Sequence, residues 1–265
     1  MLEIQHLTKV FNAGTVNEKR AVTDLSLTVN NGDYITIVGS NGAGKSTLFN
    51  AIAGVFTPDS GRIMLDGNNI TFEPDYKRSV YIGRMFQDPL KGTAPHMSIK
   101  ENLALAYLRA GNPRPLSRIS RKDEELFRDQ LKMLEMGLED RMNTPVGTLS
   151  GGQRQALTLL MATIVPPKLL LLDEHTAALD PAAANKVMEL TNRIVSEHHM
   201  TCMMITHNLK QAMQTGNRTF MMKDGQIVLD LQGEQRKNLT IEDLLRMFRE
   251  GTNEEFDNDR ILLSE

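Results

Sequence analysis

Residues 34–47 read Tyr-Ile-Thr-Ile-Val-Gly-Ser-Asn-Gly-Ala-Gly-Lys-Ser-Thr, and this stretch decides the fold. Its second part, Gly39–Thr47, matches the phosphate-loop pattern G-x-x-x-x-G-K-[ST], which is credible only between a strand and a helix. The apolar run Tyr34–Val38 predicts a buried parallel strand. After the loop, Leu48, Ile52 and Val55 recur at helical spacing and predict a helix with one buried face. The context therefore indicates an α/β protein.

The loop itself carries groups that suit a polyphosphate. Gly39, Gly42 and Gly44 permit tight turns, so that successive backbone N–H groups can point at one anion. The helix N-terminus adds the positive end of its dipole. Lys45 is placed to neutralise the terminal phosphates, and the hydroxyl of Ser46 to complete a magnesium shell. A glycine-rich turn without a ligand is the alternative. The pattern predicts that the chain binds a nucleoside triphosphate.

A second motif, Leu149–Gln153, reads Leu-Ser-Gly-Gly-Gln and precedes a helix-like stretch from Arg154 to Ile164. Ser150 can cap that helix, and Gly151 and Gly152 expose backbone N–H groups at its start. Alone, such a turn would be an ordinary helix cap. Together with the phosphate loop, it indicates a second anion-binding surface.

Four consecutive leucines, 169–172, end in Asp173 and Glu174. Such a run fits a strand buried on both faces, with its acids at the carboxyl end, where ligands of open α/β sheets bind. Asp173 is placed to hold magnesium through water, and Glu174 to take a proton from an attacking water. In isolation, the pair would be interpreted as solvated acids at a strand end.

The segment Cys202–Thr206 predicts another buried strand with a polar end, His207. We expect His207 to sense or stabilise the γ-phosphate. The alternative is a strand-end histidine whose polar atoms are simply satisfied by its neighbours.

In this order, the motifs resemble the nucleotide-binding domain of ATP-binding cassette (ABC) transporters over residues 1–230. The resemblance implies an α/β P-loop NTPase core with a mostly parallel sheet, an N-terminal antiparallel β subdomain, and an α-helical subdomain inserted at about 88–150. It implies that Gly39–Thr47 is the Walker A loop, which binds ATP, and that Leu149–Gln153 is the signature motif, which acts across a dimer. The implied ATP-binding residues are Phe11, Gly39, Ser40, Asn41, Gly42, Ala43, Gly44, Lys45, Ser46 and Thr47. The implied signature residues are Leu149, Ser150, Gly151, Gly152 and Gln153.

The resemblance also assigns the catalytic residues Glu174, His207 and Gln87, the D-loop residue Asp180, and the Mg²⁺ ligands Ser46, Gln87 and Asp173. Phe11 would stack on adenine, or else serve as a strand residue in a small core. Two positions depart from the usual pattern: His175 stands where most relatives have proline, and Ala177 where most have serine. Neither change removes a phosphate, metal or base function. We therefore expect an ATPase, with His175 as a local packing variant.

The composition agrees with a cytosolic catalytic subunit. A chain of 265 residues can bury one substantial core, or a core with a helical insert. The net charge of −3 gives no general attraction to nucleic acid, so no such partner is expected. The single cysteine, Cys202, suits a reducing compartment. No signal peptide is visible, and no apolar run approaches the ~20 residues that span a bilayer.

Residues 231–265 form a predicted C-terminal extension. The motif Thr240–Asp243 opens an amphipathic helix, with Ile241, Leu244, Leu245 and Phe248 on one face. This helix either packs on its own domain or contacts a partner subunit. Residues 254–265 form an acidic tail.

The resemblance implies a two-fold dimer, because each motif occurs once and the signature of one copy closes on ATP held by the other. It further implies permease subunits in the membrane, an extracytoplasmic solute-binding protein as an indirect partner, and a peripheral location on the cytoplasmic face. The phrases around residues 83–89, 92–102 and 173–181 resemble one bacterial subfamily of tryptophan/tyrosine-type uptake systems. The alternative is a soluble ABC ATPase, such as one of iron–sulfur cluster assembly.

The resemblance implies that the segment Asp88–Lys100 seats a cytoplasmic helix of the permease. It carries apolar Leu90, Met97 and Ile99 among polar residues, and its two prolines limit the chain entropy lost on docking. A surface loop that packs only on its own subdomain is the alternative.

Overall fold

The computed structural model describes residues 1–111 and 119–252. It contains two compact units, and each is considered by itself. The first comprises Met1–Arg78 and the chain from Thr201 onward, and the second comprises Ser79–Met200. The helical insertion proposed for residues 88–150 lies inside the second unit, and its boundaries remain a prediction. The Pro-containing break at 112–116 and the acidic tail at 254–265 lie outside the described residues.

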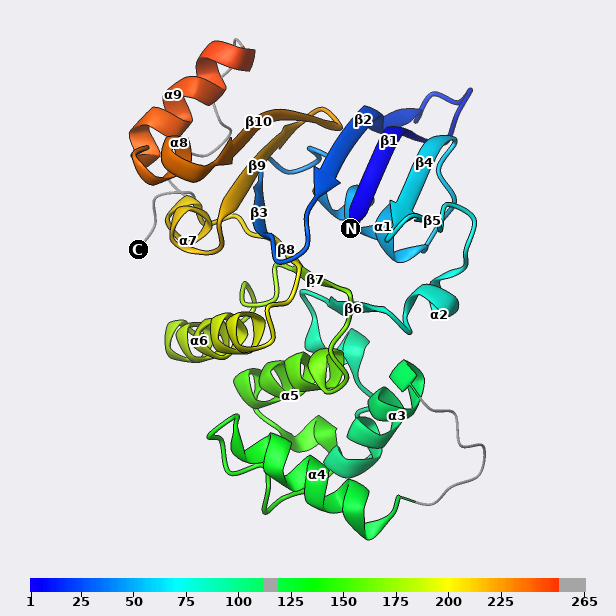
Figure 1. The fold of residues 1–265 in the computed structure, drawn as a ribbon, viewed down its shortest axis with the longest axis vertical. Helices are drawn as coiled ribbons and strands as arrows, with labels where there is room; N and C mark the ends of the chain where they lie inside the picture. Colours follow the sequence, from blue (N-terminus) through cyan, green and yellow to red (C-terminus); the bar gives the residue numbers. More distant parts are fainter. Residues whose placement is uncertain (112–118, 253–265) are drawn as a thin grey trace. The chain divides into compact units, whose positions relative to one another are not determined.

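An antiparallel sheet in the order β2-β1-β4-β5 forms one layer of the first unit (Figure 1). Its strands are β1 (Leu2–Phe11), β2 (Lys19–Val29), β4 (Ser60–Leu65) and β5 (Asn68–Asn69). In β1 the buried residues Leu2 and Ile4 alternate with exposed Glu3 and Gln5, the pattern of a sheet with one solvated face. The N-terminal antiparallel β subdomain that the resemblance implies is thereby confirmed.

A second set of strands in the first unit leads to the phosphate loop. Strand β3 (Tyr34–Val38) pairs in parallel with β8 (Cys202–Ile205) on one side and with β9 (Arg218–Lys223) on the other. Strand β10 (Gln226–Gln232) pairs antiparallel with β9. Strand β3 is buried between these two neighbours, and its sequence, like that of β8, is almost entirely apolar.

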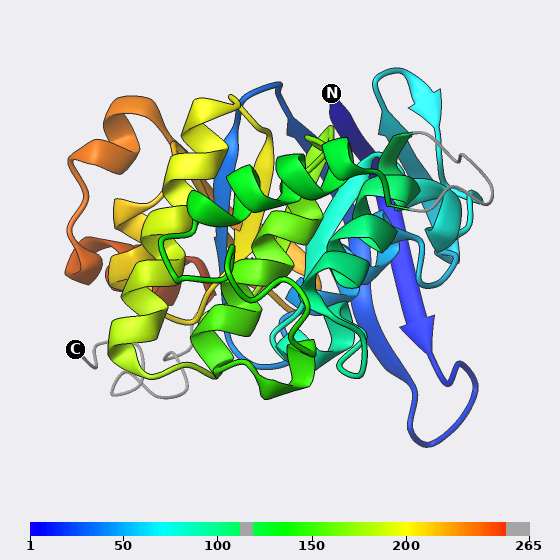
Figure 2. The ribbon, with the colours of Figure 1, turned by 90° about the horizontal axis from the view of Figure 1, so that it is seen from below.

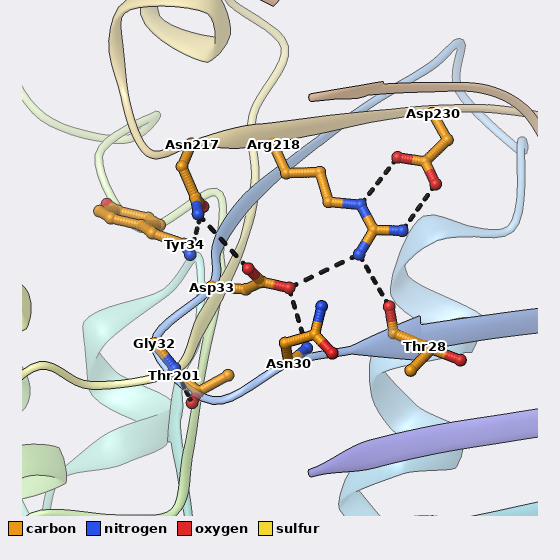
Figure 3. A network of polar contacts seen from close by, with 9 residues as sticks. All are labelled: Thr28, Asn30, Gly32, Asp33, Tyr34, Thr201, Asn217, Arg218 and Asp230. Carbon is orange, nitrogen blue, oxygen red and sulfur yellow. Dashed lines mark hydrogen bonds and ion pairs between the residues drawn. The ribbon is translucent and has the colours of Figure 1, made fainter. Parts of the chain in front are cut away.

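A polar network fixes the start of β3 (Figure 3). Arg218 donates two hydrogen bonds to the carboxylate of Asp230, at 2.8 and 2.6 Å, and one to the Thr28 carbonyl at 2.8 Å. The same guanidinium lies 3.5 Å from Asp33, the residue before β3. The hydrogen bond with Asp230 raises the pKa of Arg218, so the ion pair favours the charged guanidinium. These contacts tie β2, β3, β9 and β10 together directly upstream of the phosphate loop.

The helices of the first unit are α1 (Lys45–Ala53), α2 (Asp75–Arg78), α7 (Leu209–Gln214), α8 (Gly233–Lys237) and α9 (Ile241–Thr252). Helix α1 ends two residues before Val55, because Gly54 adopts a left-handed conformation, with φ of 80°, and caps it. The expectation that Val55 lies on the buried face is therefore wrong, and this side chain is 54% exposed.

The predicted amphipathic helix after Thr240 is present as α9. Leu244 and Leu245 are buried in a cluster with Val38, Leu209 and Met221, and Ile241 packs against the same cluster. The helix thus packs on its own unit, beside α7 and β10 (Figure 1). The fourth predicted member of this face, Phe248, lies outside the side chains that the structure describes.

The second unit contains two parallel strands and a group of helices. Strands β6 (Ile82–Met85) and β7 (Leu169–Asp173) pair in parallel. The helices are η1 (Pro89–Gly92), α3 (Ile99–Gly111), α4 (Arg121–Lys132), η2 (Val146–Thr148), α5 (Gly151–Thr163) and α6 (Pro181–Glu197). Helix α5 contacts both α3 and α6, and Figure 2 shows these helices side by side.

Among the described residues, no helix is both long enough and apolar enough to cross a membrane.

Candidate functional site: the phosphate loop and the carboxyl ends of the strands

The phosphate loop has the backbone that its glycines predict. Gly39 and Gly44 have φ of 154° and 98°, a region that L side chains rarely adopt. A Cβ at Gly39 would also collide with the carbonyl of Met222, and one at Gly44 with the carbonyl of Ala21. Strand β9 and strand β2 therefore approach the loop so closely that only glycine fits at these two positions.

The ammonium of Lys45 lies over the loop. Its Nζ donates to the carbonyl of Gly39 at 2.7 Å and to the carbonyl of Ser40 at 3.0 Å, and the residue is 5% exposed. Ser46 follows in the first turn of α1 and is exposed. A buried cation, a helix N-terminus and an exposed hydroxyl thus stand within one turn of chain, an arrangement suited to an anionic ligand.

His207 lies at the same edge as the loop. Ile205, the last residue of β8, pairs with Ile37, and the amide of Thr206 donates to the Ile37 carbonyl at 3.1 Å. The loop around His207 is held by Thr206, whose hydroxyl donates to Gln211 at 2.6 Å. The first unit therefore brings together Gly39–Thr47 and His207, as their strand positions predict.

Phe11 ends β1 with its side chain 36% exposed. Its ring packs edge-to-face on Phe56 at 5.5 Å, and the ammonium of Lys9 lies 5.6 Å from its centroid. Lys9 is in turn bound to Asp59 at 2.9 Å. The Phe11 ring is thus held by Phe56 and Lys9 while part of it stays exposed, as stacking on a base requires. Its role in adenine binding stays a prediction.

In the second unit, three predicted residues share one strand edge. Met85, the last residue of β6, pairs with Leu172 of β7, so Gln87 follows β6 at the edge where Asp173 and Glu174 end β7. Gln87 is exposed, whereas Asp173 and Glu174 are largely or partly buried. Glu174 has φ of 47°, and a non-glycine residue in that region marks a constrained backbone.

The residues after Glu174 form a tight connection to α6. His175 is 2% exposed, and its Nε2 lies 3.1 Å from the hydroxyl of Thr191. Burial lowers the pKa of His175 to about 4, so the ring is neutral at pH 7. This agrees with a packing role. Asp180, the predicted D-loop residue, caps α6 by accepting from the amide of Ala183 at 3.0 Å.

The signature motif forms the start of α5, as predicted. Ser150 is the N-cap: its hydroxyl accepts from the Gln153 amide, and the Gln153 side chain accepts from the Ser150 amide, both at 3.3 Å. Ser150 and Gly151 are exposed, whereas Leu149 and Gly152 are buried. A Cβ at Gly152 would come within 2.9 Å of Ala183, so this glycine also lets α5 approach α6.

Two side chains near these motifs were not singled out from the sequence. Arg84 on β6 lies 3.9 Å from the carboxylate of Asp173. Asn102, 1% exposed, accepts from the Ala94 amide at 2.8 Å and donates to the carbonyls of Ala94 and Ser98, each at 3.0 Å. Asn102 thereby holds the segment that follows Gln87. Their positions were the only signal in the sequence. Arg84 stands three residues before Gln87, and Asn102 stands near the start of α3.

The expected docking segment is only partly exposed. Leu90 is 47% exposed and Met97 is half-buried, but Ile99 is completely buried at the start of α3. The expectation that Ile99 offers an apolar contact to a partner is therefore wrong, because it belongs to the core of its own unit. The amides of Val146 and Gly147 donate to the segment at 3.0 and 2.8 Å, so its backbone is pre-formed.

Comparison with known proteins gives a consistent result. The ABC transporter family profile matches residues 22–177. A tyrosine transport ATP-binding protein of Clostridioides difficile (strain R20291) is 43% identical over 248 residues, covering 94% of this chain and 98% of that protein. A glycine betaine/carnitine/choline transport ATP-binding protein of Bacillus subtilis (strain 168) is 32% identical over 86% of this chain and 57% of its own length.

Solved structures show the same similarity. The ATP-binding cassette MJ0796, solved as a dimer in a post-hydrolysis state with ADP and Pi, superposes with a TM-score of 0.74 and 26% identity, covering 88% of this chain and 98% of that chain. The cbiO1 protein of Clostridium perfringens, part of the transporter complex cbiONQ, has a TM-score of 0.75 and 25% identity, over 94% of each chain.

Proposed function

Since this chain belongs to the ABC transporter family and is an ATPase with the ABC cassette fold, we propose that it drives the import of an amino acid through a membrane permease. The observation that carries the proposal is the 43% identity to a tyrosine transport ATP-binding protein over nearly the whole of both chains. Tyrosine or a related aromatic amino acid is the substrate we favour. The substrate itself would contact the permease and the solute-binding protein, because an ATPase subunit does not bind it.

In the proposed site, the loop Gly39–Thr47 holds the phosphates of ATP through backbone N–H groups and Lys45. Phe11 stacks on adenine, and His207 donates to the γ-phosphate. Glu174 takes a proton from the attacking water. Glu174 and His207 each stand at the carboxyl end of a parallel strand, which is where ligands of α/β sheets bind.

We propose Mg²⁺ as the companion ion. Ser46, Gln87 and Asp173 supply hydroxyl, amide and carboxylate oxygens, the hard ligands that Mg²⁺ prefers. Within residues 1–111 and 119–252, no three His, Cys, Asp or Glu side chains cluster as a metal site would require. That fits an ion held largely by phosphate oxygens and water. When bound, the ion would neutralise charge that develops between the β- and γ-phosphates.

The assembly we propose is a two-fold dimer on a permease. Ser150 and Gly151 are exposed at the N-terminus of α5, available to a γ-phosphate held by a second copy of this chain. The dimeric MJ0796 cassette supports this arrangement. The dimer would lie at the cytoplasmic face of the membrane, with a solute-binding protein on the opposite side delivering the amino acid.

The test begins with affinity purification of the tagged chain from its native cells in mild detergent, with co-purifying proteins identified by mass spectrometry. A permease should co-purify, and cells lacking this chain should lose uptake of labelled tyrosine while retaining uptake of labelled glycine betaine. Uptake should return with the wild-type chain but not with Glu174→Gln. Recovery of the chain without any membrane protein would contradict the proposal and favour a soluble cluster-assembly ATPase.

A further inference from the structure

The turn after β7 begins at the strained residue Glu174. The amide of Ala177 donates to the Glu174 carbonyl at 3.0 Å, which closes a four-residue turn with His175 at its second position. A left-handed φ for a residue other than glycine costs about 1–2 kcal/mol and persists only where the surroundings impose it. The backbone of Glu174, with φ of 47°, therefore needs an anchor.

His175 is placed to be that anchor. Its ring is buried, and Nε2 lies 3.1 Å from the hydroxyl oxygen of Thr191, a fully buried residue of α6. The Thr191 hydroxyl donates its own proton to the Val187 carbonyl at 2.8 Å. Its oxygen can then only accept from the ring, which assigns the proton to Nε2 of a neutral imidazole. In this contact the Nε2–H of His175 therefore donates a hydrogen bond to the hydroxyl oxygen of Thr191.

We propose that His175 is a positioning residue for Glu174: its hydrogen bond to Thr191 fastens the turn to α6 and so fixes the carboxylate that activates water. The inference rests on the proposed role of Glu174 as general base. His175 directly follows Glu174 in the chain. Movement of the His175 ring would therefore also move the backbone that carries the Glu174 carboxylate. A shift of about 1 Å at a reacting group can cost ~100-fold in rate.

Thr191→Val removes the acceptor with little change in volume, and Thr191→Ser retains the hydroxyl. His175→Gln retains an N–H donor at the position of Nε2. We expect Thr191→Val to lower kcat about 10-fold to 100-fold while KM and the Kd for ATP change less than about twofold. Thr191→Ser and His175→Gln should stay within about threefold of wild type. Thermal unfolding of each variant shows that it is folded.

A double-mutant cycle of Thr191→Val with Glu174→Gln distinguishes loss of Glu174 positioning from general damage to the fold. In a Glu174→Gln background the carboxylate is absent, so Thr191→Val should cause no further loss of residual turnover. An equal loss in both backgrounds, or a parallel loss of ATP binding, would overturn the positioning role. Unchanged kcat in Thr191→Val, beside an inactive Glu174→Gln, would also overturn it. Full turnover by Glu174→Gln alone would instead contradict the proposed general base.

Discussion

The guanidinium of Arg84 lies 3.9 Å from the carboxylate of Asp173, on the neighbouring strand. The parallel register sets Arg84 beside Leu171, two residues before Asp173, and the guanidinium also lies 4.5 Å from the ring of Phe86. Both charged side chains are largely buried, at 14% and 15% exposure. The proposed magnesium ligand therefore has a cationic neighbour held in place by an aromatic ring.

This pair predicts a change in magnesium dependence. Arg84→Gln removes a charge that competes with the metal for Asp173, so half-maximal ATPase activity should need about 3-fold to 10-fold less Mg²⁺. Titrating ATPase activity with Mg²⁺ at saturating ATP measures the effect. Arg84→Lys is the matched control, since it retains the charge and should remain near wild type. A higher Mg²⁺ requirement in Arg84→Gln would show that Arg84 supports the metal site instead.

The general base is tested by Glu174→Gln. The amide cannot accept the proton of water, so turnover should fall about 10²–10⁴-fold while ATP still binds. Size-exclusion chromatography with ATP and Mg²⁺ should show accumulation of an ATP-bound dimer. Near-wild-type hydrolysis by this variant would remove Glu174 from its assigned role.

Substitutions in the phosphate loop and in the signature motif should impair different steps of the ATPase cycle. Lys45→Ala removes the buried ammonium and should weaken ATP binding by the monomer. Ser150→Arg places a bulky cation at the exposed start of α5, leaves the loop of its own copy intact, and should block dimer closure and hydrolysis while monomer binding persists. Fluorescent-nucleotide titration and dimer chromatography separate the two. Equal loss of monomer binding in both variants would contradict the action of Ser150 across a dimer.

The docking segment offers a matched pair of substitutions. Leu90 is 47% exposed, so Leu90→Asp should lower permease co-purification and uptake at least severalfold while the isolated subunit keeps its ATPase rate. Ile99 is fully buried, so Ile99→Asp should instead destabilise the fold by several kcal/mol through an unpaired buried carboxylate. Met97→Asp, at a half-buried position, should show both effects in part. Full uptake by Leu90→Asp would place the docking surface elsewhere.

Cys202 gives a prediction about pH and reactivity. Burial raises the pKa of its thiol well above the ordinary value. The Cys202 thiol of the unfolded chain therefore loses its proton at a lower pH than the thiol of the native protein. Its contribution to the free energy of unfolding is fully present below the ordinary pKa of about 8.5 and falls as the pH rises above that value. Denaturation at pH 8 and pH 10 should show this loss in the wild type but less in Cys202→Ala. In native protein at pH 8, a thiol reagent should label Cys202 only on the timescale of unfolding.

Several local features were determined by the sequence alone. Strand β7 has the bounds Leu169–Asp173 that the leucine run indicates, and Ser150 caps α5 as its hydroxyl beside two glycines predicts. Gly39 and Gly44 likewise predicted a tight turn, and both residues have positive φ in the loop. These properties could be read in advance because they depend on residues within one or two turns of each other, through hydrogen bonding to the local backbone and burial of short apolar runs.

Tertiary structure decided which groups meet. The sequence gives no sign that Arg84 lies beside Asp173, that His175 is fastened to Thr191, or that Ile99 is buried while Val55 is exposed. Each outcome depends on strand register or on the packing of a helix against residues far away in the chain. A pattern of apolar and polar residues predicts that one face of an element is buried. Which segment of the chain packs on that face depends on the sum of many weak contacts across the whole unit.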